Sequence, residues 1–285
     1  MDTQEALLRV ENLKVSYRSG KTYNTVVEGV SFDLGRERLG IVGESGSGKS
    51  TIGRALLKLL PTARIEATRM DFGGTDLLAA SERQMLAIRG RRISMILQDP
   101  KFSLNPVHRV GDQIAEAYRV HTRASGQAAR QKTLEMLEAV KIRDPERVFG
   151  LYPHEVSGGM GQRIMIAMML IPEPQIIIAD EPTSALDVTV RMQVLNILNE
   201  LVTNKGIGLI MISHDLNLVR NFCDRVLVMR SGEVVEERAA RDMKNCTHPY
   251  TKGLLAAQPH IGGSRKPLPV LNREASNRDI KEVRA

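Results

Sequence analysis

The sequence is poor in aromatic residues and cysteine, and it has no tryptophan. Aromatic residues make up 4% of the 285 residues, and the two cysteines, Cys223 and Cys246, show no C-x-x-C spacing. They cannot form a disulfide scaffold, which agrees with a reducing compartment, and we expect both to be buried or half-buried. The net charge of +7 comes without a long run of Lys and Arg. Beside so few aromatic residues, this charge indicates a solvated surface rather than a nucleic-acid interface.

Long apolar runs are also missing. The longest, Ile164–Ile171 and Ile176–Ala179, fall well short of the ~20 residues that a membrane-spanning helix needs. Residues 1–10 are acidic and polar, without the basic and apolar regions of a signal peptide. The hydrophobic content of 42% and the charged content of 26% are ordinary for a globular domain. We therefore expect a globular chain in the cytoplasm that does not cross a membrane by itself.

The spacing of apolar residues predicts both strands and helices. Alternation predicts strands at Leu8–Tyr17 and Val26–Leu34, and a buried strand at Arg38–Val42 leads into a glycine-rich loop. A helix then begins at Lys49, and Pro61 is expected to end it. The apolar face of this helix comprises Ile52, Ala55, Leu56, Leu59 and Leu60.

The rest of the chain alternates between strands and helices. The predicted elements are a strand at Arg92–Leu97, mainly helical residues from about 110 to 140, a strand at Ile176–Ala179, a helix at Val188–Thr203 and a strand at Ile207–Ile212. This order predicts an α/β fold with a parallel core sheet, an antiparallel β subdomain and a helical insertion. We place the domain at residues 1–260, its helical subdomain at about 99–171 and a C-terminal extension at 245–285, with a polar tail beyond about Gly262.

The glycine-rich segment GESGSGKS fits the phosphate-loop pattern G-x-x-x-x-G-K-[ST]. Backbone N–H groups of such a loop surround phosphates, Lys49 would neutralise the β and γ oxygens, and the Ser50 hydroxyl would hold Mg²⁺. A flexible glycine linker is the alternative, and the flanking strand and helix disfavour it. The predicted nucleotide-binding residues here are Gly43, Glu44, Ser45, Gly46, Ser47, Gly48, Lys49, Ser50 and Thr51.

Two carboxylates follow the buried strand Ile176–Ala179. Asp180 and Glu181 therefore emerge at the carboxyl edge of the sheet, where α/β proteins bind ligands. Asp180 suits the Mg²⁺ shell, and Glu181 suits the orientation of an attacking water. Alternatively, Asp180 is only a turn residue before Pro182.

A second glycine-rich segment, VSGGMGQR, begins another helix. Ser157, Gly158 and Gly159 stand at its start, where a helix N-terminus favours an anion. An ordinary helix cap at Ser157 is the alternative. Gly161 follows in the helix interior, where glycine costs ~1 kcal/mol relative to alanine.

Taken in order, the phosphate loop, Gln98, the SGG helix start, the DEP segment and His214 resemble the nucleotide-binding subunit of an ABC transporter. The resemblance covers residues 8–259, nearly the whole chain. It implies the fold of an ABC-type P-loop NTPase domain, with ATP and Mg²⁺ as ligands.

The resemblance also implies roles for single residues. Tyr17 would stack on the adenine, unless it is only a strand aromatic. Glu181, His214, Lys49 and Gln98 would be catalytic, and Ser50, Gln98 and Asp180 would surround Mg²⁺. Ser157, Gly158, Gly159 and Asp187 would contact ATP held by the other subunit of a dimer.

Two further segments, Ile88–Val107 and Thr247–Leu255, are similar to the ATPases of bacterial dipeptide, oligopeptide and nickel importers. The resemblance implies an ATPase that powers uptake through a separate permease, peripherally on the cytoplasmic face of the inner or cell membrane. Its partners would be a second ATPase, the same or a similar chain, and indirectly a solute-binding protein, without nucleic acid. The alternative, an ABC ATPase acting on nucleic acid or the ribosome, has only the charge of +7 in its favour.

The segment Gln98–Val107 is the expected contact with the permease. It begins at a nucleotide contact and continues into a loop whose apolar residues Phe102, Leu104 and Val107 we expect to be exposed. The alternative is that Phe102 and Leu104 pack on the helical insertion.

Overall fold

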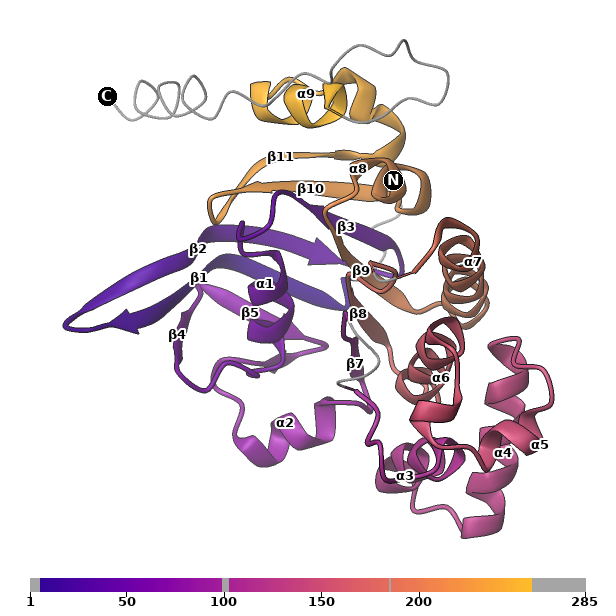
Figure 1. The fold of residues 1–285 in the computed structure, drawn as a ribbon. Helices are drawn as coiled ribbons and strands as arrows, with labels where there is room; N and C mark the ends of the chain where they lie inside the picture. Colours follow the sequence, from indigo (N-terminus) through magenta and orange to yellow (C-terminus); the bar gives the residue numbers. More distant parts are fainter. Residues whose placement is uncertain (1–5, 99–102, 185, 258–285) are drawn as a thin grey trace, which may run out of the picture.

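The computed structural model describes residues 6–98, 103–184 and 186–257. These residues form two β-sheets with helices around them (Figure 1). The expected polar tail lies outside the described residues. Within the described ranges, no helix combines the length and the apolar character that crossing a bilayer requires.

The first sheet is antiparallel and comes from the N-terminal part of the chain. Its path is β2–β1–β5–β6, and β4 pairs with the other end of β1. The strands are β1 (Leu8–Ser19), β2 (Thr22–Leu34), β4 (Ala63–Glu66), β5 (Arg69–Phe72) and β6 (Thr75–Asp76).

The second sheet carries the strand ends that position the site. In spatial order its strands are β11 (Glu233–Ala239), β10 (Arg225–Arg230), β3 (Arg38–Val42), β9 (Gly208–Ser213), β8 (Ile176–Asp180) and β7 (Ile93–Ile96). Neighbouring strands are parallel, except that β11 is antiparallel to β10. Val42 pairs with Ser213, and Asp180 pairs with Ile212, so β3, β8 and β9 end at one edge. The predicted α/β fold with its parallel core is confirmed.

Helices, some of which pack mainly on other helices, lie on both sides of the second sheet. They are α1 (Lys49–Leu56), α2 (Glu82–Ile88), α3 (Val110–Thr122), α4 (Gly126–Ala139), α5 (Pro145–Phe149), α6 (Gly158–Leu170), α7 (Val188–Lys205), α8 (Leu216–Phe222) and α9 (Pro249–Ala256), with short 3₁₀ turns at Pro153–Glu155 and Ala240–Asn245. Helices α3 to α6 pack against one another, apart from the antiparallel sheet (Figure 1). The proposed domain limits and the limits of the helical subdomain stay predictions.

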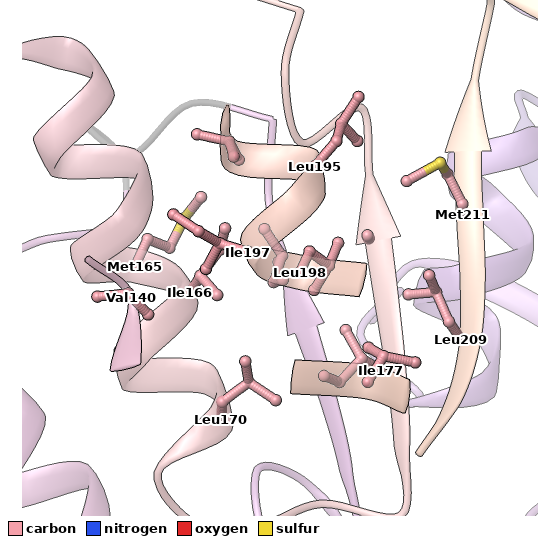
Figure 2. Packing of buried hydrophobic residues seen from close by; sticks show 14 of the residues in the cluster. Val140, Met165, Ile166, Leu170, Ile177, Leu195, Ile197, Leu198, Leu209 and Met211 are labelled. Atoms are coloured by element: carbon pink, nitrogen blue, oxygen red, sulfur yellow. The ribbon is translucent and has the colours of Figure 1, made fainter. Parts of the chain in front are cut away.

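The side chains of β8 alternate between two hydrophobic cores, because both faces of a parallel sheet are covered. Ile178 belongs to the core that includes Ile52 of α1 and the antiparallel sheet. Ile177 belongs to the core of α3, α4, α6 and α7. Figure 2 shows part of this second core, in which Ile166 of α6 lies beside Ile197 and Leu198 of α7, and Ile177 of β8 belongs to the same cluster. Helices α1 and α6 therefore cover opposite faces of the sheet.

Helix α1 is shorter than the sequence predicts. It ends at Leu56 rather than at Pro61, and Leu59 is exposed. Lys58 has a left-handed backbone (φ 50°), and its ammonium donates hydrogen bonds to the carbonyl oxygens of Leu78 and Ala80 at 2.6 and 2.8 Å. These contacts from a distant segment end the helix, although the apolar periodicity continues beyond it.

Candidate active site

The phosphate-loop segment Gly43–Ser50 connects the end of β3 to the start of α1. Its path requires glycine at two positions. A Cβ atom on Gly43 would lie 2.2 Å from the carbonyl oxygen of Met229 on β10. Gly48 has φ 95°, and a Cβ atom there would lie 2.7 Å from the carbonyl oxygen of Val26 on β2. The loop is therefore packed between the two sheets, while Ser45 and Gly46 remain exposed.

Lys49 lies inside this loop. Its ammonium donates hydrogen bonds to the carbonyl oxygens of Gly43 and Glu44 at 2.8 and 2.7 Å. Burial lowers the pKa of Lys49, although the negative charges of Glu181, Asp180 and Glu44 oppose this shift. Gly48 is at the N-cap position of α1, and no described side chain caps this helix start. The first N–H groups of α1 and the Lys49 ammonium together fit a phosphate.

Asp180 and Ser50 meet at the carboxyl edge of the sheet. The Ser50 hydroxyl donates a hydrogen bond to Oδ1 of Asp180 at 2.7 Å. Burial raises the pKa of Asp180, against the effects of this hydrogen bond and of Arg54, whose guanidinium lies 3.8 Å from Oδ2. A hydroxyl and a carboxylate supply the hard oxygen ligands that Mg²⁺ prefers, so this pair fits the ion.

Glu181 is held in place by two predicted site residues. Nε2 of Gln98 donates to its Oε2 at 3.3 Å, and Nδ1 of His214 lies 3.0 Å from its Oε1. The Glu181 backbone is left-handed (φ 47°), and its N–H donates to the carbonyl oxygen of Ile212 at 2.9 Å. This conformation is costly for a residue other than glycine and is typical of functional sites. The structure thus brings together Gln98, Glu181 and His214 from three segments that are distant in sequence.

Tyr17 lies on β1, where it pairs with Asn24 of β2 and with Ala63 of β4. Its side chain is half-buried and packs on the core beneath the antiparallel sheet. The same sheet borders the phosphate loop, because Gly48 packs on Val26 and Val27 of β2. This position agrees with either reading of Tyr17, and its stacking on adenine stays a prediction.

The structure does not bring the SGG helix start to the phosphate loop within the described residues. Ser157 caps α6 by accepting a hydrogen bond from the N–H of Met160 at 3.3 Å, and Gly158 is exposed. Asp187 caps α7 in the same way, accepting from Thr189 and Val190. Helix α6 continues through Gly161 to Leu170 without a break.

One expectation about the permease loop is wrong. Leu104 is 4% exposed and belongs to the core of the helices, whereas Val107 is 74% exposed, as predicted. The side-chain amide of Gln113 hydrogen-bonds the backbone N–H and carbonyl of Asn105, which turns the loop so that Leu104 points inward. Phe102 lies outside the described residues.

Two connections to the site were not predicted from the sequence. The buried side chain of Gln162 on α6 donates a hydrogen bond to the carbonyl oxygen of Pro182, directly after Glu181. A polar side chain on the apolar face of α6 could have signalled this contact. The hydroxyl of Tyr250 on α9 accepts a hydrogen bond from the N–H of Glu44 in the phosphate loop. No local pattern signals that contact, because 206 residues separate the two positions.

Comparisons with known proteins show the family of this chain. The family model of the ABC transporter matches residues 27–184. A probable peptide ABC transporter ATP-binding protein of Sinorhizobium fredii is 47% identical over 259 residues, which cover 90% of this chain and 77% of that protein. The dipeptide transport ATP-binding protein DppD of Bacillus subtilis is 46% identical over 261 residues, covering 90% and 78%. The oligopeptide transport ATP-binding protein OppD of Salmonella typhimurium is 45% identical over 257 residues, covering 90% and 77%.

A solved structure is also similar. It is a dimeric ATP-binding cassette in a post-hydrolysis state bound to ADP and Pi, with a TM-score of 0.72, 27% sequence identity and coverage of 82% of this chain and 99% of that one. The chain belongs to the ABC transporter ATP-binding protein family. It is an ATP-hydrolysing subunit that powers solute transport. The reading as an ATPase for nucleic acid or the ribosome is not favoured.

Proposed function

We propose that this chain hydrolyses ATP at the carboxyl edge of its parallel sheet to drive the import of short peptides. The observation that carries the proposal is the meeting of Lys49 and Ser50, Asp180 and Glu181, and Gln98 and His214 at the ends of neighbouring strands. The phosphate loop provides N–H groups and a cation for phosphates, and the strand ends provide carboxylates for Mg²⁺ and water.

The roles follow from the contacts. Ser50 and Asp180 would hold Mg²⁺ with Gln98 beside them, and bound Mg²⁺ neutralises charge on the phosphate oxygens. Glu181 would orient the attacking water with one carboxylate oxygen. Gln98 and His214 contact different oxygens of this carboxylate, and both can fix its rotation. Lys49 would turn from the loop carbonyls toward the β and γ phosphates.

The solute assignment rests on the relatives. Those named here carry peptide, dipeptide and oligopeptide transport in their names. We infer that this chain serves a peptide importer on the cytoplasmic face of the membrane, with a solute-binding protein outside that delivers the peptide. The segment Gln98–Val107 would contact the permease, with Val107 as an exposed apolar anchor.

Hydrolysis can be tested on the purified chain and transport on the assembled complex. Phosphate release should depend on both ATP and Mg²⁺ and should cease with a chelator. For transport, the permease and this subunit are placed in liposomes with ATP enclosed on the side of this subunit. Labelled di- to pentapeptides should then accumulate on that side. Uptake of a nickel chelate instead of peptides would overturn the solute assignment, and absence of Mg²⁺-dependent hydrolysis in the complex would overturn the site.

A further inference from the structure

Helix α9 near the C-terminal end of the described chain reaches the phosphate loop. The Tyr250 hydroxyl accepts a hydrogen bond from the N–H of Glu44 at 3.1 Å, and the Tyr250 side chain is buried. The helix lies on the far side of β10 and β11 from the antiparallel sheet (Figure 1). The nucleotide site as proposed above assigns no role to this helix.

The contact acts on one peptide plane, the one between Gly43 and Glu44. Its carbonyl, that of Gly43, accepts a hydrogen bond from the ammonium of Lys49 at 2.8 Å. Its N–H, that of Glu44, donates to Tyr250. Because a peptide unit is planar and rigid, hydrogen bonds at both ends fix the direction in which the loop leaves β3 before ATP binds, and the bond to Tyr250 does not depend on Lys49. The same peptide therefore connects Tyr250 to the lysine that would bind phosphate.

The two residues at the start of the segment Thr247–Tyr250 are held by a buried carboxylate on β11. Glu236 accepts hydrogen bonds from the N–H of Thr247 at 2.7 Å, from the N–H of His248 at 3.3 Å and from Nε of Arg238 at 2.7 Å. Burial alone would raise the pKa of Glu236, but these hydrogen bonds lower it to about 2. The Arg230 guanidinium lies over the Tyr250 ring, 5.3 Å from its centre. The segment Thr247–Tyr250 is thus anchored on Glu236 at one end and on the phosphate loop at the other.

We propose that Tyr250 is a positioning residue for ATP binding, and that the segment Thr247–Tyr250, anchored by Glu236, holds the phosphate loop in its binding conformation. The proposal rests on the proposed function, because it assumes that the loop binds ATP. A loop that is already ordered loses less conformational freedom on binding, so its affinity for ATP is higher. The C-terminal segment thereby sets the affinity of the site without touching the nucleotide.

The test removes the hydroxyl and keeps the ring. In Tyr250→Phe, we expect the Kd of a fluorescent ATP analogue and the KM for ATP to rise about three- to tenfold, as the loss of one hydrogen bond allows. The kcat at saturating ATP should stay within about twofold of wild type, because the substitution leaves Glu181, Gln98 and His214 in place. Tyr118→Phe on α3, a half-buried tyrosine remote from the loop, is the matched control and should bind ATP like wild type.

Hydrogen exchange gives a direct readout of the contact. The amide of Glu44 should exchange faster in Tyr250→Phe than in wild type, whereas amides of β8 should not change. Wild-type ATP affinity in Tyr250→Phe would overturn the proposal, even if its melting temperature falls, because the hydroxyl would then be only structural. If wild type itself fails to bind ATP, the proposed function fails instead.

A double-mutant cycle tests the route through Glu236. Glu236→Gln keeps the shape of the side chain and removes its charge, and alone it should weaken ATP binding. In the Tyr250→Phe background it should weaken ATP binding little further, because both changes release the same contact. Full additivity of the two effects would overturn the role of Glu236 as the anchor.

Discussion

The two glycine-rich segments of this chain that can bind an anion differ in how they are held. The phosphate loop packs on β2 and β10 and encloses Lys49. Its Glu44 N–H also donates a hydrogen bond to Tyr250 of α9. The start of α6 at Ser157 is capped by its own hydroxyl, and Gly158 is exposed. The two segments also begin helices on opposite faces of the sheet. This difference supports the proposal that one chain supplies the binding loop and its partner supplies the second anion contact.

The largest expected effect concerns the site that contains the phosphate loop, at the carboxylate of Glu181. Glu181→Gln should retain ATP binding, because the phosphate loop is untouched, and should lose at least ~100-fold in turnover, within the range for removal of a general base. The ATP-bound dimer should also persist longer. Phosphate release from the assembled transporter measures the first effect, and size-exclusion chromatography measures the second.

Glu200→Gln is the matched control for this substitution. Glu200 lies on α7, where it forms an exposed ion pair with Lys141 at 3.3 Å. Such a pair contributes little to stability, so turnover should stay at the wild-type level. Full turnover in Glu181→Gln would remove Glu181 from the catalytic role.

The next largest effect is expected at the second glycine-rich segment, the start of α6 at Ser157. Ser157→Arg should leave nucleotide binding by the isolated chain nearly intact. It should weaken ATP-dependent pairing at least about tenfold, because the long arginine side chain would fill the space at the start of α6 where the partner's ATP is expected to bind. Pairing is measured by sizing the chain with ATP and Mg²⁺, alone and with the ATPase encoded beside it.

Ser125→Arg provides the control for the lost helix cap. Ser125 caps α4 by accepting a hydrogen bond from the N–H of Ala128, as Ser157 caps α6. Both variants lose about 1 kcal/mol of helix stability from the missing cap, and only Ser157→Arg should lose pairing. Equal pairing in both variants would contradict the contact between subunits.

A smaller effect is expected at the permease loop. Val107→Ala should lower permease-stimulated hydrolysis about threefold, as truncation of an interface anchor does, and leave ATP binding by the free chain unchanged. Leu104 is unsuitable for this test, since truncation of a buried leucine costs about 2–5 kcal/mol of folding stability. Leu86→Ala removes another exposed apolar group, from α2, and should leave stimulation unchanged.

If permease-stimulated hydrolysis is unchanged in Val107→Ala, Val107 is not an anchor for the permease. A cysteine introduced at Ser103 offers a second measurement. Cross-links from that position should join the chain to the permease in the assembled complex.

The sequence predicted the elements whose signal is local. The strand Arg38–Val42 and the start of α1 at Lys49 agree with the structure, because a buried strand, a glycine loop and a helix follow one another without long-range input. The end of α1 and the burial of Leu104 were missed. Lys58 is bound by Leu78 and Ala80, and Gln113 folds the loop at Asn105. Periodicity carries no information about such partners.

In the site, too, the residues of the sequence motifs were predicted and the contacts between distant segments were not. Motif order placed Gln98, Glu181 and His214 in one site, and the structure joins them by side-chain contacts. The contact between Tyr250 and Glu44 depends on how β10 and β11 continue the sheet beyond β3, and strand order across a sheet is not written in any single segment. The resemblance of Thr247–Leu255 to importer ATPases gave no sign of its partner in the loop.

The smallest effect is a dependence of folding stability on pH. It concerns Glu236, which anchors the segment that contacts the phosphate loop. The pKa of Glu236 falls from an ordinary 4.5 to about 2 in the fold. A group with a lowered pKa stabilises the fold above its ordinary value, and the contribution is lost as pH falls through 4.5 toward about 2. Relative to Glu236→Gln, wild type should therefore keep a constant advantage in unfolding free energy from about pH 7.5 to 5.5 and lose about 1 kcal/mol of it by pH 4.

Urea unfolding of both chains at each pH measures this difference. Glu28→Gln is the control, because Glu28 forms an exposed ion pair with Lys14 at 3.1 Å, and the contribution of such a pair is small at every pH. Glu236 holds the segment that reaches the phosphate loop and makes no contact with the start of α6 among the described residues. Acid should therefore speed amide exchange at Glu44 beyond its intrinsic pH dependence and leave the amide of Met160, which Ser157 holds, at its intrinsic dependence. An advantage of wild type that is the same at pH 7 and pH 4 would show that Glu236 does not anchor this region through its charge.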